Sequence, residues 1–268
     1  MRPLIIPHYI QQYWTEDFDV KQLAEQTKNS YYKNLLKGDP EVTIVIPAYN
    51  EEKTIVRTLN SICENITTYS VEIIVVNNNS KDKTADRVEA CGVACILETK
   101  QGIMFARNCG LANARGRYII NADADTIYPR NWIQSLIEPL EKNEKAAVTY
   151  GRYSFLPEKN TKRFTYFLYE SVADISRKVN SYFKDEAVNV YGCCSAFRKQ
   201  HALQVDGYNH PSGATEDGYL ALKIRNKGFG KLLYIKQALV WTTDRRIHID
   251  GGLWVGAIKR LKRIITRS

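Results

Sequence analysis

Runs of valine and isoleucine recur through the first half of this chain, separated by segments with helical periodicity. Val42–Ile46 and Val71–Val76 are two such runs, and strands this rich in apolar residues are typical of a sheet that is covered on both faces. The segments that follow them, Glu51–Ile62 and Asp82–Ala90, are expected to be helices. Strands that alternate with helices predict an α/β fold, with a mostly parallel sheet flanked by helices.

The alternation continues beyond these units. Val93–Leu97 is a third expected strand, a helix is expected to begin near Gly102, and Tyr118–Ile120 is a further short buried strand. Open sheets of this class bind their ligands at the carboxyl ends of the strands. The segments that directly follow the strands are therefore the first places to look for a site.

The composition is that of an ordinary globular protein. The chain has 268 residues, of which 44% are hydrophobic and 25% are charged, which is enough for one large domain with a sizeable core. No apolar run reaches the roughly 18 to 20 residues that a membrane-spanning helix needs. Residues 1–8 are too short and too interrupted by proline to form a signal peptide. We expect a cytoplasmic protein.

The six cysteines show no metal-binding pattern. None of them forms a Cys-x-x-Cys pair or clusters with histidine, which argues against a zinc site. Several lie inside apolar segments, so that reduced and buried thiols are expected.

Positive charge is concentrated near the C-terminus. The net charge is +9, and twelve Lys and Arg residues lie between positions 223 and 268 against Asp244 and Asp250. Residues 249–268 have the pattern of a basic amphipathic helix, which suits peripheral attachment to an anionic membrane surface. An ordinary helix docked on the domain is the alternative. A nucleic-acid partner is not expected.

Polar, aromatic and basic residues follow the first three expected strands. Pro47–Glu51 lacks the glycines of a dinucleotide-binding turn or a P-loop, but its aromatic ring and polar groups could stack on and hydrogen-bond a base. Asn77–Asp82 is a polar turn. Lys100 and Arg107 provide cations that could reach a diphosphate. Each of these segments, taken alone, is also compatible with an ordinary turn and helix cap.

Two carboxylates, Asp123 and Asp125, stand two positions apart shortly after the strand Tyr118–Ile120. In an extended chain such residues point to the same side. A hard divalent cation such as Mg²⁺ is commonly held by one or two carboxylates together with the phosphates of a substrate. The pair therefore suits a metal-nucleotide site, with a pair of solvated turn acids as the alternative.

Four segments in series resemble the motifs of glycosyltransferase family 2. They are Val45–Glu51, Val75–Asp82, Gly102–Asn108 and Asp123–Asp125, and their order and spacing match the family over roughly residues 42 to 245. The resemblance implies a GT-A fold of Rossmann-like type, a nucleotide-sugar donor, a divalent cation (Mg²⁺ or Mn²⁺) and transfer with inversion at the anomeric carbon.

The resemblance also implies which residues bind the nucleoside. Pro47, Tyr49 and Glu51 would line its pocket, and Asn77 would contact the base. The family usually has Asp where this chain has Asn77, so the contact would be made by a neutral amide. Because an Asn carbonyl can accept the imide N–H of uracil, a UDP-linked donor is expected.

Four further residues receive implied roles at the diphosphate and the metal. Arg107 and Lys100 would lie near the donor diphosphate. Asp123 would reach the ribose or a metal-bound water, and Asp125 would bind the metal.

The second half of the chain is expected to bind the acceptor. Arg163–Phe183 is amphipathic and is expected to be a helix that packs on the sheet, with an acceptor or lipid contact as the alternative. Val190–Arg198 resembles the small-residue acceptor strand of the family, which leaves room for a sugar. The pair Glu216 and Asp217 looks like the family's Glu-Asp motif and opens the expected helix Gly218–Asn226. In this motif the second acid is the general base.

An inverting transfer needs one carboxylate to take the proton of the acceptor hydroxyl while that oxygen attacks. Asp217 is the expected base and Glu216 the reserve candidate. Acidic residues also favour helix N-termini for electrostatic reasons alone, which is the alternative.

The segment around Arg245 stands where processive members of the family carry Gln-x-x-Arg-Trp. That motif is absent, so transfer of a single sugar is expected. Arg245 and Arg246 would close over the diphosphate, with a solvated loop pair as the alternative. His248 is a candidate for a further metal ligand because it follows this loop.

These observations predict one GT-A domain over residues 42–248, made of a nucleotide-binding half (42–126) and an acceptor half (127–248). An accessory extension (1–41) precedes it and the basic C-terminal helix (249–268) follows it. The predicted function is metal-dependent, inverting and non-processive transfer of one sugar from a nucleotide-sugar to a glycan or lipid-linked acceptor, at the inner face of the cell membrane.

Two other functions compete with this prediction. A sugar nucleotidyltransferase would need a Gly-rich basic loop after the first strand, which is missing here. A non-catalytic membrane or nucleic-acid-binding module would use the basic tail, but it would leave the paired acids in the two halves of the chain unexplained.

Overall fold

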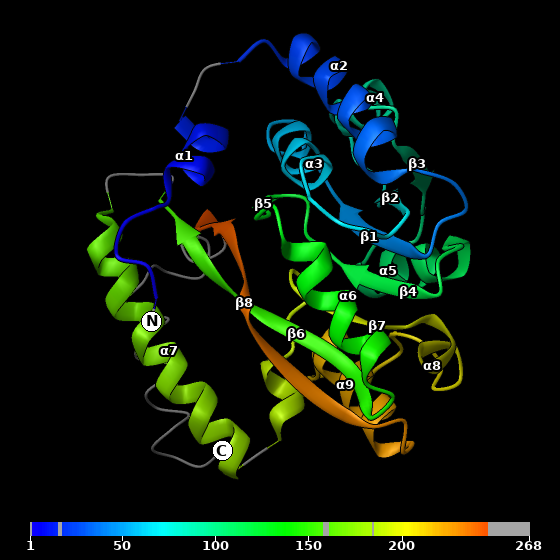
Figure 1. The fold of residues 1–268 in the computed structure, drawn as a ribbon, viewed down its shortest axis with the longest axis vertical. Coiled ribbons are helices and arrows are strands. Elements are labelled where there is room, and N and C mark those ends of the chain that lie inside the picture. Colours follow the sequence, from blue (N-terminus) through cyan, green and yellow to red (C-terminus); the bar gives the residue numbers. More distant parts are fainter. Residues whose placement is uncertain (1, 16–17, 158–160, 184, 246–268) are drawn as a thin grey trace.

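The computed structural model describes residues 2–15, 18–157, 161–183 and 185–245, in which strands and helices alternate (Figure 1). The elements up to the first candidate metal ligands are α1 (His8–Thr15), α2 (Val20–Ser30), a π-helical turn (Tyr31–Leu35), β1 (Val42–Ala48), α3 (Ile55–Cys63), β2 (Val71–Asn77), α4 (Thr84–Ala90), β3 (Ala94–Leu97), α5 (Ile103–Asn113) and β4 (Tyr118–Asn121). The remainder are β5 (Thr126–Ile127), α6 (Trp132–Lys142), β6 (Ala146–Leu156), α7 (Arg163–Phe183), a 3-10 turn (Glu186–Asn189), β7 (Ser195–Arg198), α8 (Lys199–Leu203), α9 (Glu216–Asn226) and β8 (Lys231–Thr243).

The strands of the described residues form one eight-stranded sheet in the order β3-β2-β1-β4-β7-β6-β8-β5. Within the group β3-β2-β1-β4, each strand runs parallel to the strand beside it. In contrast, β7 runs antiparallel to β4 and β6, and β5 runs antiparallel to β8. The α/β fold is confirmed, with a parallel first half and a mixed second half. Because β1, β2 and β4 are parallel, the loops that leave their carboxyl ends lie at one edge of the sheet.

Apolar side chains cover both faces of this sheet. Ile44 and Ile73 pack on one face with side chains of α3, α4 and α6, whereas Val45 and Ile74 pack on the other face with α5, α8 and α9. Neighbouring residues of a strand must point to opposite faces, so a run of Val and Ile is stable only between two layers of helices. Burying each such side chain contributes about 1.5 to 3 kcal/mol.

The extension before β1 is packed onto this core. Tyr31 and Leu35 are buried in the cluster that contains α3, and the Tyr31 hydroxyl accepts a 3.0 Å hydrogen bond from the Ile73 amide. α1 contacts α3 as well, and its Ile10 lies in a small cluster with Ile127 and Trp241. The extension therefore contributes to the same domain.

Most predicted elements are present with shifted ends. The predicted helix Arg163–Phe183 is α7, and α9 begins at Glu216, slightly before the predicted start. The helix predicted from Glu51 begins at Ile55, because a turn precedes it. The predicted strand over residues 190–198 is confined to Ser195–Arg198, since the Cys194 amide donates to the Tyr191 carbonyl and closes a turn before it.

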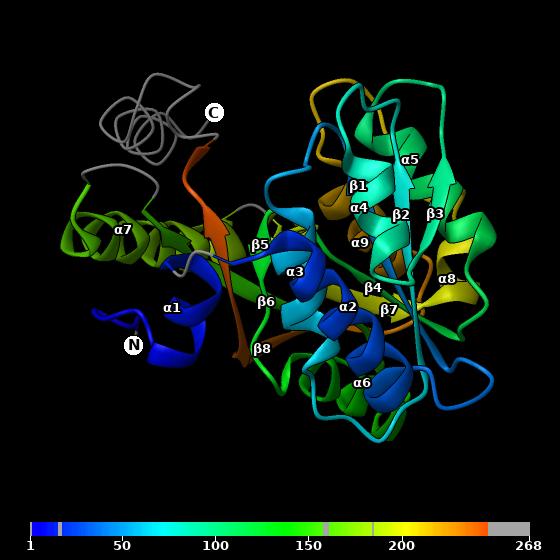
Figure 2. The same cartoon turned by 90° about the horizontal axis from the view of Figure 1, so that it is seen from above.

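The mixed end of the sheet carries α7. This helix lies far from β1, β2 and β3 and beside β6 and β8 (Figure 2). Among the described residues, no helix has both the length and the apolar character needed to cross a membrane. The predicted basic helix 249–268, Arg246 and His248 lie outside the described residues.

The helix that follows the first site loop offers a test of this core. Leu59 in α3 is fully buried, whereas Leu203 at the end of α8 is 47% exposed. Leu59→Ala is expected to lower the free energy of unfolding by about 2 to 5 kcal/mol because it removes buried methyl groups and leaves a cavity. Leu203→Ala is expected to change it by less than about 1 kcal/mol. Urea denaturation measures both, and equal losses would contradict this packing.

Candidate active site

Two cavities meet at the carboxyl ends of β1 and β4. The smaller has a volume of about 140 Å³ and lies between the loops that follow these two strands and the start of α5. The larger has a volume of about 410 Å³ and extends towards β6, α7 and the start of α9. Ile103, Asp123 and Asp125 line both cavities. The two aspartates predicted to bind the metal therefore stand where the cavities join.

The loop after β1 forms one wall of the smaller cavity. Pro47, Tyr49 and Glu51, the residues predicted to line the nucleoside pocket, all lie on this wall. Tyr49 is 51% exposed, so its ring is available to a ligand, whereas Glu51 is buried. The structure thus brings these three predicted residues together.

The Asn-rich turn after β2 braces this loop from behind. The Lys81 amide donates a 2.8 Å hydrogen bond to Asn50 Oδ1, and the Glu52 amide donates a 3.1 Å hydrogen bond to Asp82 Oδ2. Burial raises the pKa of Asp82, but hydrogen bonds from Thr84 and the Glu52 amide outweigh burial and hold it below its ordinary value. Much of the polarity of this turn therefore serves to hold the first loop.

Asn77 and Lys100 do not line either of these two cavities. Asn77 is buried, and its Oδ1 accepts a 3.0 Å hydrogen bond from the Ser80 amide. The Lys100 ammonium lies 4.3 Å from the centroid of the Phe105 ring. The side chains of Asn77, expected to contact the base, and Lys100, expected near the diphosphate, therefore lie outside the lining of both cavities.

Asn78 lines the smaller cavity instead of Asn77. Its Nδ2 donates to the Lys100 carbonyl at 2.8 Å, and its Oδ1 accepts from the Gly102 amide at 2.8 Å. This side chain fixes the loop that leads into α5. Gly102 has a φ of 136°, in the region that favours glycine.

The residues at the junction provide oxygen ligands. Asp125 accepts a 3.1 Å hydrogen bond from the Thr243 hydroxyl, and the loop between the aspartates is held by a 3.0 Å hydrogen bond from the Thr58 hydroxyl to the Ala124 carbonyl. Among the described residues, no three His, Cys, Asp or Glu side chains are grouped as a complete metal site. A pair of carboxylates facing a ligand cavity fits Mg²⁺ or Mn²⁺, which take their remaining ligands from water and phosphate.

Arg245 reaches this junction from the end of β8. Its Nη2 lies 3.2 Å from Asp125 Oδ2, its Nη1 lies 3.1 Å from Glu51 Oε2, and Nη2 also contacts Glu51 Oε1. Burial raises the pKa of Glu51 above its ordinary value, although the hydrogen bond from Arg245 opposes this. The predicted position of Arg245 beside the donor site agrees with this geometry.

Asp217 lies at the start of α9 and lines the larger cavity, as does Glu216. The residue is 6% exposed, and its Oδ1 accepts a 3.0 Å hydrogen bond from Asn121 Nδ2. Burial, together with the neighbouring charges of Glu216 and Asp123, raises the pKa of Asp217 above its ordinary value, although the positive charge of Arg107 lowers it. A carboxylate with a raised pKa at the wall of a cavity binds a proton more readily than an exposed one.

Arg107, which was expected near the donor diphosphate, lies behind the lining of the site. Its side chain is fully buried and lines neither cavity. Its guanidinium donates to Asp123 Oδ1 at 2.9 Å and to the carbonyls of Val45, Ala122 and Gly192 at 3.0 to 3.1 Å. Its Nε lies 3.9 Å from Asp217 Oδ1. Four carbonyl and carboxylate oxygens thus replace most of the water that the buried cation has lost, although Nε has no hydrogen-bond partner among the described residues. Arg107 therefore holds the acids from behind.

The turn before β7 contains Gly192, one of the small residues of the segment that was expected to leave room for a sugar. Gly192 lines the larger cavity, and a Cβ atom there would lie 2.3 Å from Asp217 Oδ2 and 2.6 Å from Arg107 Nη2. Glycine is therefore needed at this position for the close approach of the turn to the buried charges.

Several residues of the site were not recognised from the sequence. Asn121 donates the hydrogen bond to Asp217, and the Tyr208 hydroxyl donates a 2.5 Å hydrogen bond to Asn121 Oδ1. Tyr153 and Phe155 line the larger cavity. They stand two positions apart in a strand and therefore point to the same side, which was the sequence signal for an aromatic wall. Nothing in the local sequence marks Tyr208, because its partner lies 87 positions away.

A family model described as Glycosyl transferase family 2 matches residues 43–204. The chain belongs to this family. The matched region contains β1, Arg107 and both junction aspartates, whereas Asp217 and Arg245 lie beyond it.

Curated relatives carry the same kind of name. "Glycosyltransferase GlyA" of Streptococcus pneumoniae is 24% identical over 212 residues, which cover 75% of this chain and 30% of the relative. "Probable glycosyltransferase YdaM" of Bacillus subtilis is 26% identical over 227 residues, which cover 80% of this chain and 53% of the relative. The chain thus spans about a third to a half of the length of these relatives.

Solved structures confirm the GT-A fold. A mannosyltransferase, PcManGT from Pyrobaculum calidifontis, in complex with GDP-Man and Mn²⁺, has a TM-score of 0.59 and 17% identity, with 92% of this chain and 81% of that chain covered. Glucosyl-3-phosphoglycerate synthase from Mycobacterium tuberculosis, in complex with Mn²⁺, UDP and glucosyl-3-phosphoglycerate, has a TM-score of 0.59 and 18% identity, with coverages of 94% and 86%.

The burial of Arg107 can be tested against an exposed arginine with similar partners. Arg107→Gln is expected to lower the free energy of unfolding by about 3 to 5 kcal/mol because it leaves buried carboxylates and carbonyls without their partner. Arg117 also pairs with two carboxylates, those of Glu41 and Glu141, but its side chain is 57% exposed. Arg117→Gln is expected to cost less than about 1 kcal/mol. Equal losses in urea denaturation would contradict the role given to Arg107.

Proposed function

We propose that this chain is a metal-dependent, inverting glycosyltransferase that moves one sugar from a nucleotide-sugar to a hydroxyl group of an acceptor. The observation that carries the proposal is the junction of the two cavities at Asp123 and Asp125, with Asp217 on the wall of the larger one. A donor in the smaller cavity would present its anomeric carbon at this junction. An acceptor in the larger cavity would then lie beside a buried carboxylate.

The proposed chemistry assigns one task to each group. Asp217 takes the proton from the acceptor hydroxyl while that oxygen attacks the anomeric carbon, and the bond to the diphosphate breaks on the opposite side. A bound Mg²⁺ or Mn²⁺, held by Asp125 with Asp123, would neutralise the charge of the departing diphosphate. Arg245 supplies a second positive charge on that side when it exchanges Glu51 for phosphate oxygens.

The proposed donor is a UDP-sugar. Tyr49 offers an exposed ring at the wall of the smaller cavity for stacking on the base. The sequence lacks the Gln-x-x-Arg-Trp motif of processive enzymes, which supports transfer of a single sugar. A glycan or lipid-linked acceptor and attachment to an anionic membrane through residues 249–268 complete the proposal.

Metal and donor binding test the donor half of this proposal. Binding of UDP, GDP and dTDP is measured by calorimetry with Mn²⁺ and with a chelator. UDP is expected to bind only with metal, and Asp125→Asn is expected to weaken this binding on the order of 100-fold because it removes a charged ligand. Asp86→Asn on the exposed face of α4 is the control and should bind like the native chain. UDP binding that is unchanged by the chelator and by Asp125→Asn would contradict a metal-nucleotide site.

The role of Asp217 as the base is tested by measuring the release of UDP from a UDP-sugar. This assay does not require the acceptor to be known. Asp217→Asn is expected to slow the release of UDP from a UDP-sugar by about 10² to 10⁴-fold, because water or acceptor loses its proton acceptor. The affinity for UDP with Mn²⁺ should stay unchanged.

Glu216→Gln is the matched control for this test, since the neighbouring acid lines the same cavity. It should retain most of the turnover. The reverse pattern, with loss of turnover only in Glu216→Gln, would move the role of base to Glu216.

A further inference from the structure

The larger cavity has one wall made of aromatic rings. Tyr153, Phe155, Tyr169 and Tyr191 all line it. Their rings are in contact with one another: the centroid of Tyr153 lies 5.3 Å from that of Phe155 and 5.2 Å from that of Tyr191, and Phe155 lies 6.1 Å from Tyr169. A continuous aromatic wall of this kind binds flat apolar surface.

The charged groups of the same cavity are all acidic. Among the described residues, its lining contains four carboxylates, those of Asp123, Asp125, Glu216 and Asp217, and no Lys or Arg side chain. With the first two assigned to metal and donor, Glu216 and Asp217 still face the acceptor. Clefts lined by one sign of charge attract the opposite sign and repel their own.

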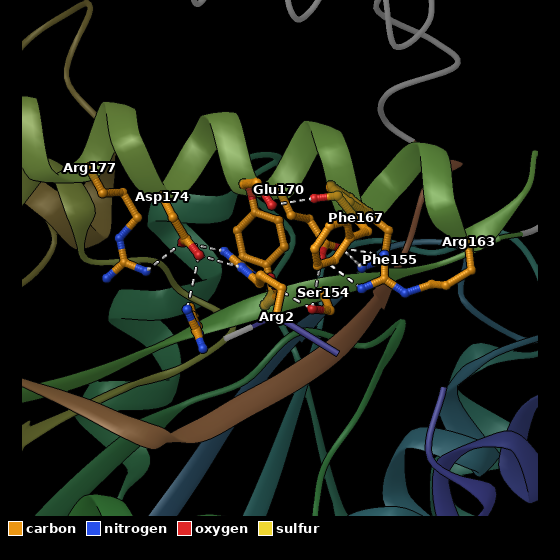
Figure 3. A network of polar contacts seen from close by, with 11 residues as sticks. Arg2, Ser154, Phe155, Arg163, Phe167, Glu170, Asp174 and Arg177 are labelled. Atoms are coloured by element: carbon orange, nitrogen blue, oxygen red, sulfur yellow. Dashed lines mark hydrogen bonds and ion pairs between the residues drawn. The ribbon is translucent and has the colours of Figure 1, made fainter. Parts of the chain in front are cut away.

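Arginines do lie close by, but they are paired with acids of α7 (Figure 3), and several of them enclose a separate small space with the rings of the wall. Asp174 in α7 accepts a bidentate pair of hydrogen bonds from Arg2, at 2.8 and 2.9 Å, and a third from Arg152 at 3.0 Å. Arg177 lies 3.9 Å from the same carboxylate. Burial raises the pKa of Asp174, but its bonds to Arg2 and the nearby arginines outweigh this and hold it below its ordinary value.

Glu170, one turn earlier in α7, holds a further arginine. It accepts hydrogen bonds from Arg163 at 2.7 and 3.1 Å and from the Phe155 amide at 2.8 Å. The space enclosed between Arg2, Arg152 and the wall has a volume of about 10 Å³, which is room for about one water molecule. These cations therefore stabilise the wall and are closed off from a ligand in the larger cavity.

We infer that the acceptor, within the function proposed above, is a neutral sugar ring and not a phosphorylated or carboxylated molecule. A pyranose has an apolar face of C–H groups that packs on aromatic rings, and its hydroxyls donate hydrogen bonds to carboxylates. A neutral sugar ring can therefore contact both the aromatic wall and the carboxylates of the cavity. A phosphate or carboxylate in the same place would meet Glu216 and Asp217 with no cation of the described residues at the lining.

Matched sugars test this inference by binding. Methyl glucoside, methyl galactoside and methyl mannoside are compared with their 6-phosphates and their uronic acid counterparts, by calorimetry on the full chain saturated with UDP and Mn²⁺. At least one neutral glycoside is expected to bind, and to bind about tenfold or more tightly than both of its charged counterparts, because like charges oppose the latter.

Two tyrosines of α7 form a matched pair that tests the contribution of the aromatic wall. Tyr169 lines the cavity, whereas Tyr182 is 87% exposed and does not line it. Tyr169→Ala is expected to weaken binding of the neutral glycoside about tenfold through loss of one stacked ring. Tyr182→Ala should leave it unchanged.

A charge added at the rim gives a gain-of-binding test. Val188 lines the cavity and is 47% exposed, so a longer side chain has room there. Val188→Lys is expected to tighten binding of the 6-phosphate about tenfold without tightening that of the neutral glycoside.

Three outcomes would overturn the inference. A charged sugar that binds the native chain as tightly as its neutral counterpart would do so. Equal effects of Tyr169→Ala and Tyr182→Ala would do so as well. Absence of all sugar binding, with UDP still bound, would overturn the inference and leave the donor site intact, whereas absence of UDP binding would overturn the proposed function itself.

Discussion

The buried guanidinium of Arg107 is the contact on which the site depends. A cation without water is stable only where carbonyl oxygens and carboxylates replace its hydration. Arg107 takes these from β1, from the loop after β4 and from the turn at Gly192, and it lies against both Asp123 and Asp217. One side chain therefore sets the relative position of the proposed metal ligand and the proposed base, which are 94 positions apart in the chain.

The two halves of the sheet contribute different things to this arrangement. The parallel strands β1, β2 and β4 bring three loops to one edge, where the turn after β2 braces the loop after β1. The mixed strands β6, β7 and β8 return the chain to the same edge and supply the second cavity, so that rings from β6 and α7 face the acids of α9. The smaller cavity is lined mostly by loops, whereas the larger cavity also takes residues from β6, α7, β8 and α9.

Local patterns were sufficient to predict the parallel half of the fold and the cavity-lining acids. Runs of Val and Ile reveal covered strands, and the spacing of Asp123 and Asp125 places both at one strand end. The positions of Asn77, Lys100 and Arg107 could not be predicted in this way. Each has chemistry that suits a ligand, but Asn77 and Arg107 satisfy buried backbone groups and Lys100 packs on a ring. Whether a polar side chain faces the ligand or the core depends on partners that are distant in sequence.

The carboxylate of Asp174 gathers the guanidinium groups of Arg2, Arg152 and Arg177 beside the aromatic wall. The charges of these arginines are balanced within the scaffold, so they do not offset the acidic lining of the larger cavity. Removing the carboxylate of Asp174 would leave three guanidinium groups beside the aromatic wall without their shared counter-charge, at a cost in stability because buried charges need partners.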